Sequence, residues 1–280
     1  MNKIIFGMSI LLYSALSAFA VTHNAIKSCY DLAKIDGKNT VISKEIFVLI
    51  DQTTPLDEEL KQSVIQNSVA NVNYGNAFTV AKFSAFVQGN YAGVVNSAQL
   101  DWPLKEDIRN DTPKKLLQGY DKCMKAQVGY AKKILDDSIS QTFGATTNTI
   151  VRSDILKSLQ ELAKNTVRTS MAKQKTVFIV SDMLENSSIT SFYYKNGVKK
   201  IDPASELKIV EANKMFADFG GANVYILGAG LVPSTSKVAS ETYRDPKTMN
   251  ALQEFWKMYF KKSNAKLIEF GQPALLNTVK

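Results

Sequence analysis

Three short, continuous runs of apolar residues alternate with segments of helical pattern, and this alternation limits the chain to an α/β architecture. The runs are EIFVLID (45–51), KTVFIVSD (175–182) and ANVYILGAG (222–230). Each is short and almost uniformly apolar, which predicts a strand buried on both faces. A fourth run, AKLIEFG, follows the last helical segment. We therefore predict a largely parallel central sheet flanked by helices on both faces.

The segments between these runs supply the covering helices and one hairpin. Alternation in AFTVAKFSAFVQ, the turn signal GNY and the returning AGVVNSAQLDW predict the hairpin, which adds one antiparallel strand. No repeat, low-complexity tract or Pro/Gly-rich linker interrupts the pattern, so residues 44–280 are predicted to form one domain. Apolar residues recur at helical spacing in five segments: 55–72, 111–143, 153–166, 205–221 and 245–264.

Residues 1–20, MNKIIFGMSILLYSALSAFA, have the pattern of a secretory signal peptide. A lysine precedes an apolar run, and small residues end in the A-x-A type of cleavage site. We expect an exported chain, periplasmic or extracellular, that starts at Val21; a retained membrane anchor is the alternative. No later segment has 18 continuous apolar residues, so we expect no membrane span after signal cleavage. Residues 21–43 are predicted to be an N-terminal extension.

The sequence holds two cysteines, Cys29 and Cys123. Because an exported chain meets an oxidising environment, we expect them to form a disulfide; two buried thiols are the alternative. His23 is the only histidine, which argues against a zinc site and against catalysis by histidine. The net charge is +8, but the lysines are dispersed along the chain. We therefore expect no nucleic-acid partner.

Two of the predicted strands end on an aspartate. Asp51 ends the first strand and Asp182 ends a later one. The carboxyl ends of parallel strands meet at one edge of a sheet, where α/β proteins bind ligands. Carboxylate and hydroxyl oxygens are the ligands that Mg²⁺, Mn²⁺ and Ca²⁺ prefer. The alternative interpretation is local: each aspartate caps the helix or turn that follows it.

The element order and these strand ends resemble the von Willebrand factor A (vWA) family over residues 43–275. That family's metal-ion-dependent adhesion site begins with Asp-x-Ser/Thr-x-Ser after the first strand. It adds a threonine from a later loop and an aspartate after a later strand. The resemblance implies that Asp51, Thr53 and Asp182 occupy three of these positions and bind Mg²⁺, Mn²⁺ or Ca²⁺.

The remaining positions of the motif are less regular. For the loop hydroxyl, the resemblance points first to Thr149, with Thr147 and Ser153 as alternatives. Pro55 stands where the first motif has its last hydroxyl, so one expected ligand is missing. Met183 follows the second aspartate, where the family often has glycine.

The resemblance implies a protein-binding module that presents a loop surface at the carboxyl edge of its sheet, within a bacterial-type envelope or secretion assembly. No complete catalytic signature is present, so we do not expect an enzyme. Two alternatives stay open: a metal-dependent hydrolase or phosphatase that uses both aspartates, and a structural envelope component without a ligand site. Residues close to the predicted site are expected to contact the partner protein: Thr54, Glu185, Phe192, Tyr193 and Tyr194.

Overall fold

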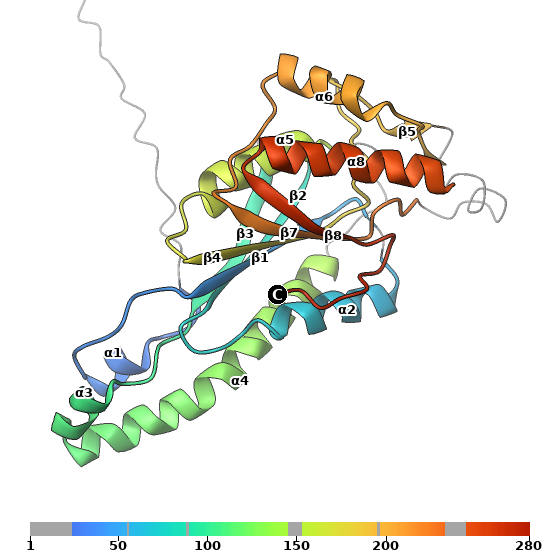
Figure 1. Ribbon diagram of the computed structural model, residues 1–280. Helices are drawn as coiled ribbons and strands as arrows, with labels where there is room; N and C mark the ends of the chain where they lie inside the picture. The colour runs from blue at the N-terminus through green and yellow to red at the C-terminus, as the bar shows by residue number, and fades with distance from the viewer. Residues whose placement is uncertain (1–23, 55, 88–89, 145–152, 195–196, 233–244) are drawn as a thin grey trace, which may run out of the picture.

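A six-stranded sheet forms the centre of the computed structural model, which describes residues 24–54, 56–87, 90–144, 153–194, 197–232 and 245–280 (Figure 1). Its strands are β1 (Lys44–Asp51), β2 (Ala77–Val87), β3 (Asn90–Gln99), β4 (Gln174–Val180), β7 (Ala222–Leu227) and β8 (Ala265–Phe270). They lie in the order β3-β2-β1-β4-β7-β8. β3 is antiparallel to β2, and every other pair is parallel. The predicted α/β class with one antiparallel strand is confirmed.

Helices cover both faces of the sheet and complete a three-layer arrangement (Figure 1). One layer contains α2 (Glu58–Val69) and α4 (Lys114–Gly144). The other contains α5 (Ile155–Leu162), α6 (Pro203–Ala212) and α8 (Pro246–Lys262). α5 ends in a turn of π-helix, and a small separate hairpin is formed by β5 (Tyr193–Tyr194) and β6 (Gly197–Val198).

The two layers of helices explain why the central strands are apolar on both faces. Along β1, Ile46, Val48 and Ile50 belong to the cluster beneath α2 and α4, whereas Phe47 and Leu49 belong to the cluster beneath α5 and α8. In a strand covered on only one face, apolar residues would alternate with polar residues. The continuous apolar runs therefore follow from burial of β1 on both sides.

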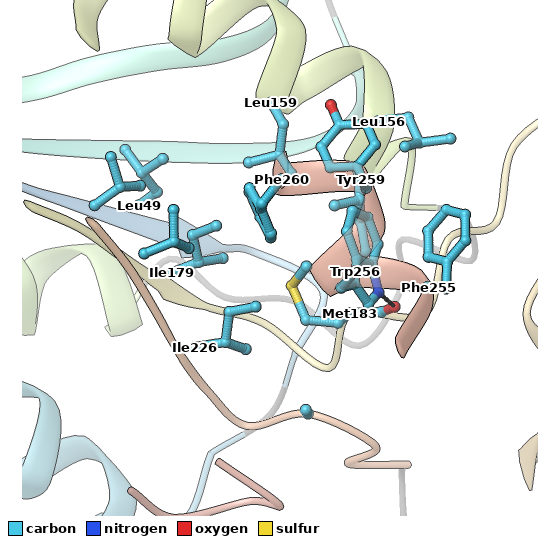
Figure 2. Packing of buried hydrophobic residues seen from close by; sticks show 14 of the residues in the cluster. Leu49, Leu156, Leu159, Ile179, Met183, Ile226, Phe255, Trp256, Tyr259 and Phe260 are labelled. Atoms are coloured by element: carbon cyan, nitrogen blue, oxygen red, sulfur yellow. Dashed lines mark hydrogen bonds between the residues drawn. The ribbon is translucent and has the colours of Figure 1, made fainter. Parts of the chain in front are cut away.

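The helix α8 contributes most of the aromatic core on its side of the sheet. Figure 2 shows its aromatic side chains beside the labelled aliphatic side chains of β1, β4 and β7. All four of these aromatic residues are fully buried: Phe255, Trp256, Tyr259 and Phe260.

The predicted N-terminal extension is folded onto the amino-terminal half of α4. It contains the short helix α1 (Cys29–Ala33), and a second short helix, α3 (Glu106–Asp111), lies beside it (Figure 1). The predicted disulfide is present between Cys29 and Cys123, with the two Cα atoms 5.6 Å apart. Around it lies a small third core that includes Tyr30, Tyr120 and Met124. Neither α1 nor α3 was predicted.

One helix ends earlier than its apolar spacing predicts. The segment 205–221 is helical only to Ala212, and Lys214 adopts a left-handed φ of 56°. Beyond the C-cap residue Asn213, the segment is a turn followed by irregular chain that leads to β7. Along the described part of the chain, no helix combines the length and apolar character that crossing a membrane requires. The predicted signal peptide lies outside the described residues.

Candidate ligand site at the carboxyl edge of the sheet

The two aspartates flank the position where the direction of chain crossover reverses. β1 lies between β2 and β4, and the chain proceeds from β1 toward β2 but from β4 toward β7. The two connections therefore leave the carboxyl edge in opposite directions, and such a reversal marks the place where α/β sheets commonly bind ligands. Asp51 is the last residue of β1, and Asp182 lies two residues beyond the end of β4.

The Asp51 carboxylate joins three separate segments of the chain. Its Oδ1 accepts hydrogen bonds from the Thr53 amide (2.9 Å) and hydroxyl (2.6 Å). Its Oδ2 accepts from the hydroxyls of Ser181 (2.7 Å) and Ser153 (3.2 Å). Asp51 is 1% exposed, and this burial raises the pKa of its carboxyl, while the hydrogen bonds act in the opposite direction.

The Asp182 carboxylate is held by donors that follow it in the chain. Its Oδ1 accepts from the Leu184 amide at 2.8 Å, and its Oδ2 accepts from the Tyr193 hydroxyl. The Asp182 amide donates to the Thr54 hydroxyl at 3.0 Å, which joins the ends of β1 and β4. Burial, reinforced by the negative charge of Asp51, raises the pKa of Asp182 to about 8.

The backbone turn directly after Asp182 is formed by Met183. Its φ is 57°, in the left-handed region that favours glycine. Its side chain is fully buried, and its carbonyl accepts a hydrogen bond from the Trp256 indole N–H at 2.9 Å (Figure 2). The position after Asp182 thus has the backbone conformation for which a glycine is suited, and the core packing of Met183 offsets the strain of about 1 kcal/mol or more.

Among the residues that the structure describes, Ser153 supplies the hydroxyl that reaches Asp51 from the loop before α5. The Ser153 carbonyl also accepts the Asn186 amide at 2.9 Å, so this loop is tied to the segment after β4. Thr149, the first choice for this position, and Thr147 lie outside the described residues. Ser181, the residue before Asp182, was not among the predicted site residues; its contact with Asp51 follows from the pairing of β1 with β4.

Three of the five expected partner-contact residues are buried, which corrects that expectation. Thr54 is 3% exposed, and Glu185 and Phe192 are fully buried. Glu185 accepts the Leu156 amide at the start of α5 (2.9 Å). The Phe192 ring packs edge to face against Phe255, with centroids 4.9 Å apart. These side chains fill the core and leave no surface for a partner in this conformation.

The two tyrosines are placed differently from these three. Tyr193 is partly buried, and its hydroxyl reaches Asp182, whereas Tyr194 is 55% exposed. Burial, together with the nearby Asp182, raises the pKa of the Tyr193 hydroxyl. Of the five residues predicted to contact a partner, Tyr194 is therefore the one whose side chain is mostly exposed.

In this arrangement the described residues satisfy both carboxylates with hydrogen-bond donors of the chain itself. All four oxygens of the two carboxylates already accept hydrogen bonds from the chain. The residue at position 55 is a proline and has no hydroxyl. Within the described segments, no group of three or more His, Cys, Asp or Glu residues is arranged to hold a metal ion. Hydrogen-bond donors supply the compensation that buried carboxylates require.

The fold is that of a doubly wound α/β protein with one antiparallel edge strand. No protein-family model matches the chain, and no curated protein matches its sequence. The crystal structure of an aerotolerance-related membrane protein from Bacteroides fragilis NCTC 9343, with multiple mutations to serines, is similar to it. That similarity covers 82% of this chain and 92% of that chain, with 12% sequence identity and a TM-score of 0.35.

Proposed function

We propose that this chain is an exported, vWA-like protein-binding module that uses the loops at the carboxyl edge of its sheet to bind a partner in an envelope or secretion assembly. The observation that carries this proposal is the convergence of polar side chains from three segments far apart in the chain. Asp51 with Thr53, Ser153, and Ser181 with Asp182 meet at the crossover reversal. Their order along the chain is that of the vWA adhesion motif.

Binding, and not catalysis, is the activity that this geometry supports. Every carboxylate oxygen of the two aspartates is held by an internal donor, so neither carboxylate is placed to attack a substrate or to activate a water. The disulfide between Cys29 and Cys123 suits an oxidising compartment such as the periplasm or the cell exterior. We propose that the partner contact does not require Mg²⁺, Mn²⁺ or Ca²⁺, in contrast to the full family motif.

Site-specific photo-crosslinking in the producing cells tests this proposal. A photoreactive phenylalanine analogue replaces Tyr194, which is 55% exposed beside the site; the matched control replaces Met171, which is 87% exposed before the start of β4, at the opposite edge of the sheet. We expect a discrete crosslinked protein from position 194 that is absent from position 171 and unchanged by a chelator. The same product from both positions, or none from position 194, would refute the proposal.

A further inference from the structure

We infer that the Tyr193 hydroxyl takes the place of a cation at this site, so that the native chain is insensitive to divalent ions because its own phenol occupies Asp182. This inference rests on the proposed vWA-like character of the site. It concerns how the site is closed, and does not concern which partner it binds.

At Asp182, the hydrogen bond from Tyr193 differs in origin from the other one. Leu184 donates from two residues away in the chain, within the same turn as the aspartate. Tyr193 lies eleven residues from Asp182 and enters from the separate β5–β6 hairpin. Its hydroxyl is therefore a donor that the turn around Asp182 does not itself supply.

The backbone around Tyr193 is held by contacts that do not involve its hydroxyl. The neighbouring Phe192 is buried in the core, its amide donates to the Glu185 carbonyl (2.8 Å) and its carbonyl accepts the Lys199 amide (2.7 Å). Tyr193 itself pairs with Val198 across the hairpin. Replacement of Tyr193 by phenylalanine thus removes one hydroxyl and leaves the hairpin anchored.

Without that hydroxyl, the site gains an available oxygen. Asp182 Oδ2 loses its donor, while the hydroxyl oxygens of Thr53 and Ser153 keep lone pairs that their hydrogen bonds to Asp51 do not use. No lysine, arginine or histidine of the described segments forms an ion pair with Asp51 or Asp182. The one carboxylate oxygen without a donor, Asp182 Oδ2, and these hydroxyl oxygens are then hard ligands available to a divalent cation.

The test compares Tyr193→Phe with the unaltered chain and with Tyr194→Phe, which makes the same change at the next residue. Each purified protein is melted after chelation, with Mg²⁺, Mn²⁺ and Ca²⁺ added separately, and free Mn²⁺ is followed by electron paramagnetic resonance. We expect several degrees of ion-dependent rise in Tm, and loss of the free Mn²⁺ signal, for Tyr193→Phe alone. The additional change Asp182→Asn is expected to abolish both effects.

Two results would overturn the inference. If the unaltered chain binds a divalent ion as well as Tyr193→Phe does, the phenol does not close the site. If Tyr193→Phe, with its circular dichroism spectrum unchanged, gains no ion binding, then the missing hydroxyl at position 55 excludes the cation, and Tyr193 does not. Neither result bears on the crosslinking from position 194, so the proposed function and this inference fail separately.

Discussion

Met183 is the residue at which backbone strain and core packing oppose each other most directly. We predict that Met183→Ala lowers the free energy of unfolding by about 2–5 kcal/mol, because the side chain is fully buried. Met183→Gly loses the same side chain but relieves the left-handed conformation, so it should cost about 1 kcal/mol less than Met183→Ala.

Urea unfolding of both variants measures this difference. Ile179 in β4 provides the control, since it is equally buried in a strand of ordinary conformation. There glycine should cost more than alanine. If glycine is the worse substitution at both positions, the strain at Met183 is not significant.

Asp51 is predicted to contribute more to stability than an aspartate that only caps a helix. Asp51→Ala leaves the hydroxyls of Thr53, Ser153 and Ser181 without their acceptor, which should lower the free energy of unfolding by about 3 kcal/mol. Asp57 caps α2 through the Leu60 amide, and Asp57→Ala should cost about 1 kcal/mol. Equal losses for the two variants in urea unfolding would contradict the role of Asp51 as the centre of a network.

Glu185 is predicted to make the protein less stable as the pH rises. Burial raises its pKa to about 8, so the folded protein keeps a proton that the unfolded chain releases near pH 4.5. Its contribution to stability is fully present below pH 4.5 and is lost as the pH rises to about 8, with a slope of about 1.4 kcal/mol per pH unit.

Glu185→Gln isolates this effect, because glutamine stays neutral at every pH. The free energy of unfolding of the variant should therefore fall less steeply between pH 5 and pH 8 than that of the unaltered chain. The difference between the two slopes excludes the contribution of Asp182, which is common to both proteins. Identical slopes would show that Glu185 is ionised in the folded protein.

Among the elements, the helix α4 has two different environments along its length. Its 31 residues span about 46 Å. The second half packs on the sheet through Ala131, Leu135 and Ile139. The first half extends past the sheet and packs on α1 and α3, away from the main core (Figure 1). The projecting part depends on its own small core and on the disulfide.

We predict that the disulfide accounts for much of the stability of this projection. The Cys29→Ser/Cys123→Ser double substitution should lower the free energy of unfolding by about 4 kcal/mol, because the bridge joins residues 94 apart in sequence. Urea unfolding with and without a reductant measures the loss. The unaltered chain in reductant should match the double variant in its ordinary buffer; a reductant effect on the double variant would point to another cause.

The elements that could be predicted are those whose burial is visible in the sequence. The strands β1, β4 and β7 were predicted because burial on both faces removes polar residues from them. The hairpin was predicted from the alternation of its residues and from its turn signal. α1 and α3 have five and six residues and show too little periodicity to be recognised. The helix over 205–221 was overextended because its apolar spacing continues past Ala212, whereas the left-handed Lys214 ends it.

On the scale of the whole molecule, strand order decides which parts of the site were predictable. Asp51 and Asp182 were expected to meet because both end parallel strands, and the pairing of β1 with β4 places them together. The positions of Phe192 and Tyr193 were not predictable. They lie at the start of the short β5–β6 hairpin, where adjacent side chains point in opposite directions: the Phe192 ring enters the core, and Tyr193 reaches Asp182.

The central position of β1 has a consequence for how the chain reaches this structure. β1 is the first strand in sequence, yet one of its two neighbours, β4, begins only at residue 174. A chain that emerges N-terminus first therefore holds an apolar strand with one unpaired edge while more than a hundred further residues follow. Unpaired apolar edges invite pairing with other chains, and such distant pairing slows folding. Protection of the nascent chain by a chaperone would thus matter more for this protein than for one whose central strand forms last.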